Sequence, residues 1–222
     1  MNLFLHYPNF EKFTIFGGAE SLQRVNLPFL PLTPKNVQKT DSSRPFVAFC
    51  DGSALNNGLK NCRAGYACVF PDNERWNIAK AIPQTSVRTI NRAETMAAIE
   101  AVKRVNLEDP TMKRGELFLA TEEFGALFFA LALLIYTDSN LLVKTFQEWI
   151  YGWMKNDWLT TNKQPVKNKD LIDQFLQLKG ERKVLWAHVY SHTDATDWKS
   201  FWNNKADRLA KAAAHKLNKL KF

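Results

Sequence analysis

The sequence predicts an α/β domain in which helices flank a five-stranded mixed sheet. Three strand-type runs follow one another without a helical pattern between them, at residues 46–50, 64–70 and 76–82, and this order favours antiparallel neighbours. Later strand-type runs are preceded by helical patterns, so we expect them to join the sheet in parallel. One early run and one late run end on an aspartate, Asp51 and Asp138. Open α/β sheets bind ligands at the carboxyl ends of their strands, so we expect a functional site there.

The composition fits one soluble domain with a hydrophobic core and an extension. The chain has 222 residues, of which 45% are hydrophobic and 23% charged. The net charge of +8 is a modest excess, and its placement is more informative, because Lys and Arg concentrate after Trp149 among tryptophans. Cys50, Cys62 and Cys68 lack metal-ligand spacing and are expected to be reduced residues in or near the core. We therefore expect an intracellular monomer, nuclear or cytoplasmic and not secreted.

Residues 1–44 differ from the rest of the chain. Pro28, Pro31 and Pro34, followed by the polar residues 40–43, predict an extended linker. The opening residues lack the charged start and apolar length of a signal peptide, and the Arg-rich pattern of a mitochondrial import segment. We expect a poorly ordered N-terminal extension at 1–44 and a folded domain at 45–222.

The early elements of the domain follow from turn and helix signals. Residues 46–50 form the first strand, and residues 71–73 (PDN) mark a turn between the second and third strands. A helix begins near Asn91, carries a broad apolar stripe and ends at Asp109 and Pro110. Three antiparallel strands and one helix are therefore expected up to this point.

The later elements alternate between strands and helices. The apolar run that ends at Asp138 is interpreted as a strand, and residues 141–151 restore helical spacing. A short helix at 171–178, a strand at 184–190 and a last helix from Asn203 complete the order. This order requires a mixed sheet with helices on its faces.

Four carboxylates stand where these elements could bring them together. Asp51 and Asp138 end strands, Glu94 lies near the start of one helix, and Asp207 lies in the first turn of the last helix. Taken singly, the helical pair would complement helix dipoles and the strand pair would be solvated turn acids. Taken together, they suit Mg²⁺, which prefers oxygen ligands. Two such ions about 3.5–4 Å apart can activate water and stabilise the leaving oxygen in phosphodiester hydrolysis.

From about residue 45 to residue 217 the chain resembles the type 1 ribonuclease H family. The resemblance is carried by FVAFCDGS, TINRAETMAAIEAV, IYTDSNLLVKTFQEWIYGW, NDWLTTNKQPVKNKDL and NNKADRLAKAAA, with the carboxylates in the family's order D, E, D, D. Each motif alone is weak, whereas the ordered set is specific. It implies a ribonuclease-H-like fold and an endonuclease that hydrolyses the RNA strand of RNA–DNA hybrids, leaving 5′-phosphate and 3′-hydroxyl ends.

The resemblance also implies individual roles at the site. Asp51 would bridge two Mg²⁺ ions, with Mn²⁺ as an alternative, while Glu94 and Asp138 would bind one ion and Asp207 the other. His192 matches a flexible-loop histidine that shuttles protons and assists product release. The added stretch DATDWKS lengthens the loop after His192, so its reach to the phosphate is an open question. A lone loop histidine is otherwise an ordinary surface residue, and His188, inside a strand, is expected to be structural.

The chemical feature that separates RNA from DNA, besides the thymine methyl group, is the 2′-hydroxyl. Asn91 matches family residues that contact 2′-hydroxyls, whereas Ile90 stands where an amide side chain is usual. Discrimination would therefore depend more on the backbone at that position. Thr89 and Asn168 match the family's pocket for a phosphate of the DNA strand. A helix-cap or turn role explains each of these residues equally well from sequence.

A basic, tryptophan-rich segment follows Asp138. Its aromatic and basic members are Trp149, Trp153, Trp158, Lys144, Lys155, Lys163, Lys167 and Lys169. Helical spacing predicts that Trp149 packs partly inside. The resemblance implies the family's basic protrusion, which holds the DNA strand by phosphate charge and by stacking on sugar or base. The residues predicted to contact nucleic acid are Trp153, Trp158, Lys155 and Lys167.

Residues 113–132 form an atypical insertion before the Asp138 strand. The uncharged stretch at 124–136 is too short for a membrane span, so no membrane association is expected. The insertion is either a surface element that packs or finds a partner, or translated intron sequence, since residues 115–117 (GEL) are compatible with a splice donor. A genuine insertion would threaten the register of the Asp138 strand.

The leading hypothesis is therefore an enzyme whose partner is an RNA–DNA hybrid. The alternative is a catalytically impaired ribonuclease-H-like protein that only binds nucleic acid, its metal site spoiled by the insertion. A related exonuclease is disfavoured by the His192 loop and the tryptophan segment. The presence of all four carboxylates favours the enzyme.

Overall fold

The computed structural model describes residues 45–111, 116–121, 125–130, 133–190 and 197–216, with the backbone alone described for the two short stretches between 116 and 130. The predicted extension at 1–44 and His192 lie outside the described residues. No described helix is long and apolar enough to cross a membrane.

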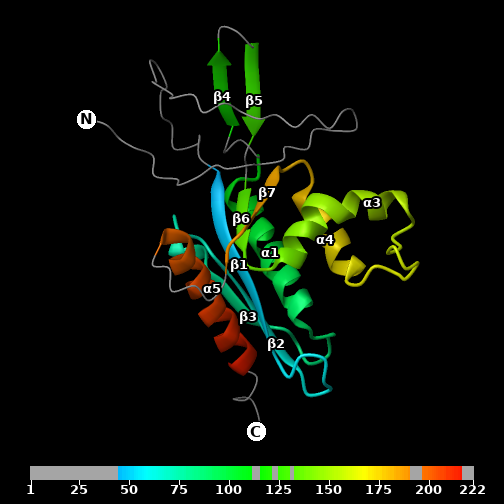
Figure 1. Cartoon of the computed structure of the whole chain (residues 1–222). Coiled ribbons are helices and arrows are strands. Elements are labelled where there is room, and N and C mark those ends of the chain that lie inside the picture. Colours follow the sequence, from blue (N-terminus) through cyan, green and yellow to red (C-terminus); the bar gives the residue numbers. More distant parts are fainter. Residues whose placement is uncertain (1–44, 112–115, 122–124, 131–132, 191–196, 217–222) are drawn as a thin grey trace. The chain divides into compact units, whose positions relative to one another are not determined.

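A five-stranded sheet in the order β3-β2-β1-β6-β7 forms the centre of the domain (Figure 1). The first three strands, β1 (Phe46–Leu55), β2 (Arg63–Val69) and β3 (Ile78–Ala81), are antiparallel neighbours. The other two, β6 (Leu133–Thr137) and β7 (Val184–His188), are parallel additions beside β1. The predicted mixed sheet is confirmed.

The register of the parallel strands sets the position of the site. Phe49 of β1 pairs with Tyr136 of β6, which in turn pairs with Ala187 of β7. Asp51 lies two residues after Phe49, and Asp138 lies two residues after Tyr136. The two aspartates therefore lie at the same height on neighbouring strands. The insertion before β6 therefore leaves the strand register intact, contrary to the threat that it posed in the sequence.

Helices cover both faces of the sheet. On one face, α1 (Ile90–Glu108) and α4 (Lys169–Lys179) pack on a core that includes alternate β1 residues such as Ala48 and Cys50. On the other face, α5 (Trp198–His215) covers the intervening residues. Figure 1 shows α5 and α1 on opposite sides of β1. All three cysteines are buried and free, as expected.

The helical region after β6 is divided. A short helix α2 (Asn140–Lys144) leads into a π-helical turn at Thr145–Trp149, and α3 (Ile150–Lys155) continues from it. The sequence predicted one helix at 141–151. Wider π-turns add a residue to a helical turn and often occur at functional sites.

Two predicted boundaries were wrong, and both change the setting of a carboxylate. β1 continues to Leu55, so Asp51 lies within the strand, because the backbone remains paired with β2 beyond it. α5 begins at Trp198, so Asp207 lies in the middle of the helix and not in its first turn. The earlier start has a local cause: the Asp197 carboxylate accepts hydrogen bonds from the backbone N–H groups of Lys199 and Ser200.

Two smaller boundaries also differ. The strand predicted at 76–82 is shorter, because Glu74–Trp76 forms a 3₁₀ turn capped by the Asn73 side chain. The strand predicted at 184–190 ends at His188.

The described part of the insertion is a β-hairpin. Its strands, β4 (Glu116–Thr121) and β5 (Gly125–Ala130), pair only with each other among the described strands. They form an antiparallel ladder from Glu116 opposite Ala130 to Thr121 opposite Gly125.

Two consecutive residues, Arg182 and Lys183, hold the chain before and after this insertion. Arg182 is almost fully buried and donates to the carboxylate and the carbonyl of Asp109 and to the Asn106 side chain. Asn106 also donates to the Leu178 carbonyl at 2.7 Å. On the far side of the insertion, the Leu133 N–H donates to the Lys183 carbonyl at 3.2 Å.

Candidate active site

The two strand carboxylates lie on the α5 face of the sheet. Val47 and Phe49 belong to the core beneath α5, and alternation along the strand gives Asp51 the same side. The same alternation from Tyr136 places Asp138 on that side, directly after β6. Asp51 is 4% exposed, whereas Asp138 is only partly buried. The site therefore has a buried floor and a more open edge.

Glu94 reaches the site because β1 and α1 pack unusually closely at Gly52. A Cβ atom at Gly52 would lie 2.8 Å from the Ala93 carbonyl carbon and closer still to the Glu94 nitrogen. Real side chains do not make such contacts, so only glycine permits this approach of helix and strand. The residue after Asp51 thus brings the start of α1, and Glu94 with it, beside the strand.

Ser139 holds Glu94 in place. Its buried hydroxyl donates to Glu94 Oε2 at 2.5 Å and accepts from the Leu142 N–H at 3.2 Å, which caps α2. The Ser139 N–H in turn donates to Thr137 Oγ1. One serine therefore joins the end of β6, the start of α2 and the carboxylate of α1.

The fourth carboxylate, Asp207, comes from α5. It is partly buried and pairs with Lys211 one helical turn later, with 2.7 Å between Nζ and Oδ2. Asp207 is near enough to Asp51 to raise the pKa of that carboxyl. The structure thus brings all four predicted carboxylates into one electrostatic group.

The electrostatics of the floor are strongly perturbed. Burial, followed by Asp138 and Asp207, raises the pKa of Asp51 to about 8, even though the Gly52 N–H donates to it at 2.7 Å. Burial also raises the pKa of Glu94 to about 7, against the opposing effect of the Ser139 hydrogen bond. The groups that raise these pKa values are acidic, and those that lower them are neutral donors. Among the described residues, no cation contributes to the pKa shifts of Asp51 and Glu94, whereas Asp207 pairs with Lys211.

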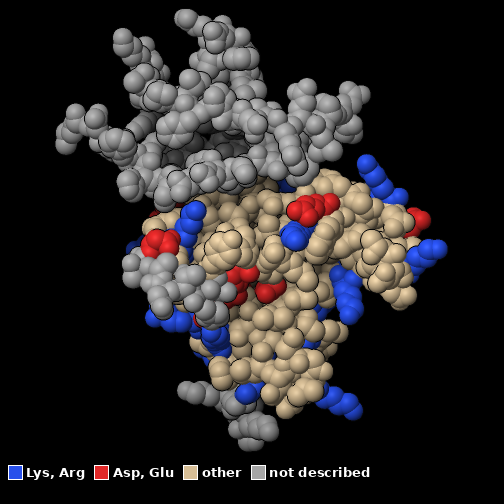
Figure 2. All heavy atoms as spheres, in the orientation of Figure 1, with Lys and Arg blue, Asp and Glu red and all other residues tan. Residues whose placement is uncertain are grey.

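A divalent cation would fit this donor set. The carboxylate oxygens are hard ligands, and a bound cation would stabilise the ionised forms of Asp51 and Glu94, which burial and then the neighbouring carboxylates disfavour. Among the described residues, however, no three His, Cys, Asp or Glu side chains are already arranged as a metal cage. Figure 2 shows acidic side chains near the middle of the displayed face, with further acidic and basic side chains around them.

A histidine supports the open edge of the site. His188, the last residue of β7, is exposed, and its Nε2 lies 3.1 Å from the Asp138 carbonyl oxygen, in position to donate. Tyr190 packs edge-on against the His188 ring, with 5.2 Å between ring centroids. His188 thus contacts the backbone of a candidate ligand, which fits the structural role expected for it.

The residues predicted to contact the nucleic-acid backbone lie around the start of α1. Thr89 caps this helix by accepting from the Arg92 N–H, and the Asn57 side chain accepts from the Ile90 N–H at 3.2 Å. Asn91 is partly buried and Ile90 is exposed. The helix-cap explanation for Thr89 is therefore correct as local structure and leaves its predicted phosphate contact open.

Asn168 is joined to this corner by an ion pair between α1 and α4. Arg92 donates to both carboxylate oxygens of Asp170, at 2.7 and 2.9 Å, and to the Asn168 side-chain oxygen at 3.3 Å. Residues far apart in the sequence are thus brought together at the amino-terminal ends of two helices.

The tryptophan-rich segment forms a ladder of rings. Trp149 and Trp153 have ring centroids 5.8 Å apart, Trp153 and Trp158 are 6.5 Å apart, and Lys169 Nζ lies 4.5 Å above the Trp158 ring. Trp153 and Trp158 pack against the main core, whereas Trp149 is 39% exposed.

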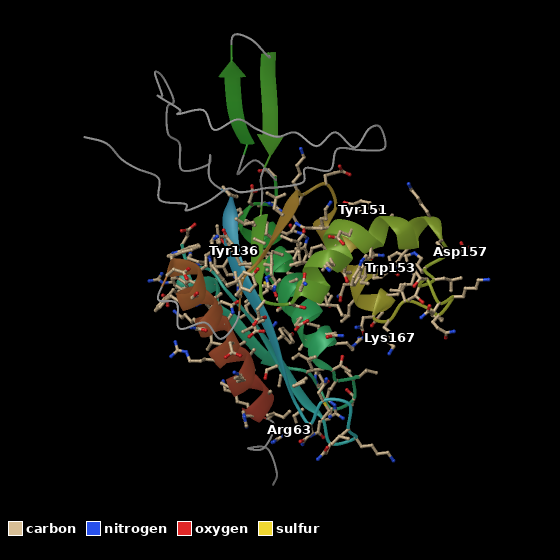
Figure 3. All side chains as sticks on the ribbon, viewed as in Figure 1. Arg63, Tyr136, Tyr151, Trp153, Asp157 and Lys167 are labelled. Atoms are coloured by element: carbon tan, nitrogen blue, oxygen red, sulfur yellow. The ribbon has the colours of Figure 1, made fainter. Side chains whose placement is uncertain are left out.

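The same segment has an unusual backbone conformation at Trp158 and exposed lysines. Trp158 has the left-handed backbone conformation, with φ of 57°, which is uncommon for a bulky residue. Lys155 and Lys167 are exposed. Figure 3 shows Trp153, Asp157 and Lys167 on the side of α3 and α4, whereas Tyr136 lies toward α5.

The sequence reasoning missed the residues that hold the site together. Ser139 carried a recognisable signal, because a serine before a helical pattern is a good N-cap. Its bond to Glu94, 45 residues away, had no local signal. The Arg92–Asp170 pair joins residues 78 apart, and no local sequence signal indicated it either.

Comparison with known proteins identifies the family. A family model described as RNase H matches residues 43–215. A curated ribonuclease H of Schizosaccharomyces pombe is 33% identical over 76% of this chain, which spans 52% of that relative's length. The ribonuclease H of Treponema denticola is 35% identical over 58% of the chain and 72% of the relative.

Solved structures agree on the fold. The solution structure of the PFV RNase H domain superimposes with a TM-score of 0.56 at 19% identity, covering 77% of this chain and 94% of that domain. A foamy viral protease–reverse transcriptase in complex with RNA/DNA hybrid gives 0.55 at 19% identity, covering 86% of this chain and 23% of that one. From the family model, the curated relatives and the mixed sheet together, it follows that the chain belongs to the ribonuclease H family of hydrolases.

Proposed function

We propose that this protein is an endonuclease that hydrolyses the RNA strand of RNA–DNA hybrids, leaving 5′-phosphate and 3′-hydroxyl ends. The observation that carries the proposal is the pair Asp51 and Glu94, two buried carboxyls whose pKa values are raised to about 8 and about 7. Burying an acid without a cationic partner costs folding free energy, and strongly perturbed pKa values are typical of functional sites. Family membership supplies the reaction class.

Two Mg²⁺ ions, or Mn²⁺ in their place, would be held by Asp51, Glu94, Asp138 and Asp207. When bound, such ions activate water and stabilise the charge that develops on phosphate and on the leaving oxygen. The chain's own residues orient these ligands: Ser139 fixes the Glu94 carboxylate, and His188 supports the Asp138 backbone. His192 is proposed to move a proton and assist product release, as the family resemblance implies.

The substrate would lie across the start of α1 and the tryptophan ladder. Asn91 and neighbouring backbone groups would read 2′-hydroxyls, and Thr89 with Asn168 would bind a phosphate of the DNA strand. The exposed lysines 155 and 167 would add phosphate charge, while Trp153 and Trp158 would provide stacking surface. A protein related to this chain by fold has been solved with an RNA/DNA hybrid, in line with this class of partner. The monomeric state and the intracellular location stay predictions.

The alternative, a catalytically impaired nucleic-acid-binding protein, is not favoured. It required the insertion to displace Asp138, and β6 keeps its pairing with both β1 and β7. Whether residues 113–132 come from an intron is a question for the transcript.

Cleavage of a labelled RNA–DNA hybrid in Mg²⁺ tests the proposal. Wild type should cut the RNA strand internally, and Asp51→Asn should abolish cutting. RNA duplex and DNA duplex serve as substrate controls. Binding without cutting by wild type would support the impaired alternative, and cutting that persists in Asp51→Asn would overturn the assignment of the site.

A further inference from the structure

Arg92 occupies an unusual position between the two helices that flank the proposed phosphate contacts. Its side chain is 16% exposed and donates two parallel hydrogen bonds to the Asp170 carboxylate, the strongest geometry for an arginine–carboxylate pair. Its backbone N–H donates to Thr89 Oγ1 at 3.3 Å. One arginine therefore contacts the cap of α1 and the first turn of α4.

Asn168 does not use its side chain to cap α4. It stands at the N-cap position of α4 with a left-handed backbone, φ of 59°, and its side chain makes no cap hydrogen bond to the helix. Asparagine at this position normally accepts from the helix N–H groups. Here its oxygen accepts from Arg92 instead, at 3.3 Å.

This contact fixes which end of the amide faces outward. A guanidinium group only donates, so the Asn168 oxygen must face Arg92, and the NH₂ group is left as the donor for a ligand. A phosphate accepts hydrogen bonds, so this orientation of the amide suits it. Asp170 holds the guanidinium in turn and lowers the net positive charge of the corner.

We propose that the Arg92–Asp170 pair is a positioning device that orients the Asn168 amide toward a phosphate of the bound hybrid. This inference rests on the proposed function, because the phosphate belongs to the proposed substrate. Arg92 and Asp170 act through Asn168 and do not themselves bind the phosphate.

The substitution Asp170→Asn separates positioning from simple charge. It removes one negative charge and frees the Arg92 guanidinium, so an account based on charge alone predicts tighter binding of nucleic acid. The positioning account predicts weaker binding, by about tenfold, or about 1.4 kcal/mol. Fluorescence anisotropy with a labelled RNA–DNA hybrid, in an Asp51→Asn background that prevents cutting, measures the difference.

The chain offers a matched control. Glu108→Asn removes the same charge from another ion pair of α1, in which Arg104 Nη1 lies 3.4 Å from Glu108 Oε1. Glu108→Asn should leave hybrid affinity within about twofold of the parent protein, because Arg104 does not contact Asn168 or Asp170. Thermal unfolding of each variant separates loss of stability from loss of binding.

A double-mutant cycle identifies the residue through which Arg92 acts. Arg92→Met should weaken hybrid binding when Asn168 is present and have little further effect in an Asn168→Ala background. Unchanged or tighter binding by Asp170→Asn would overturn the inference. So would a loss of hybrid affinity on Arg92→Met that is the same with Asn168 present and in the Asn168→Ala background. Failure of the wild-type protein to cut or bind hybrid would instead overturn the proposed function, so the two failures are distinct.

Discussion

At the scale of single residues, Asp51 and Glu94 couple the folded state to pH. In the unfolded chain these carboxyls lose their protons near pH 4. In the folded, metal-free protein, burial raises the pKa of Asp51 to about 8 and that of Glu94 to about 7. Between these limits the folded state binds more protons than the unfolded state, so its stability falls as pH rises from about 4 to about 8.

This linkage predicts that Asp51→Asn stabilises the metal-free protein at high pH. An amide carries no charge to desolvate, so the variant should exceed wild type by about 2 kcal/mol in EDTA at pH 8 and match it near pH 4. Urea unfolding at both pH values measures the difference. Asp72→Asn, at an exposed turn, is the control and should follow wild type throughout. A wild-type free energy of unfolding that stays constant between pH 4 and pH 8 would contradict the coupling.

The same residues predict the response to divalent cations. Mg²⁺ that binds only the folded state raises its stability by mass action. At pH 8 it should raise the midpoint of wild-type unfolding and have a much smaller effect on Asp51→Asn. An equal shift in both proteins would place cation binding elsewhere.

At the scale of elements, the contact between β1 and α1 decides whether the site assembles. Gly52→Ala would place a methyl group against the backbone of α1 at Ala93 and Glu94. Backbone cannot move aside as a side chain can, so we expect a loss of about 2–3 kcal/mol in unfolding free energy. Cleavage should fall further than stability accounts for, because Glu94 moves with the helix.

Gly152→Ala is the matched control for this prediction. Gly152 lies in α3, and a Cβ atom added there would meet no other atom within 4 Å, so the same substitution should be neutral or stabilising by up to about 1 kcal/mol. Chemical unfolding of both variants provides the comparison. Equal effects of the two substitutions would show that the close approach at Gly52 is unimportant.

The elements also show what sequence patterns can and cannot supply. The five strands, α1 and the existence of α4 and α5 followed from turn residues and apolar periodicity. The Asp197 cap at the start of α5 is a local signal that the sequence interpretation overlooked. The packing of Trp198 on Phe49 and Tyr136, in contrast, is a tertiary contact that no local pattern indicates. The π-turn before α3 was missed because its residues keep an ordinary helical pattern.

At the scale of the whole molecule, the four carboxylates were predicted from their order in the chain, whereas their supports were not. Asp51 and Asp138 could be placed because each follows an apolar strand pattern, and the parallel register of β1 and β6 brings both to the same level of the sheet, although Asp51 lies within β1 and not at its end. Ser139 and Arg92 could not, because their partners lie 45 and 78 residues away and no periodic pattern links them.

The molecule is also predicted to tolerate loss of its hairpin. β4 and β5 pair only with each other among the described strands, while β6 is held by β1 and β7. Replacing residues 115–131 by a short Gly-Ser linker should therefore preserve the circular dichroism spectrum and hybrid cleavage within about threefold, since loop length carries a small entropic cost. Loss of the folded signal would show that the insertion contributes to the core.

The chain on both sides of that hairpin is bonded to two consecutive residues that directly precede β7: Asp109 to Arg182, and Leu133 to Lys183. The two ends of the insertion are thus anchored independently of what lies between them. This position should therefore accept segments of different length and composition without a change in the pairing of the strands that carry the candidate carboxylates. A reporter or a second binding module could be inserted between Asp109 and Leu133 for the same reason.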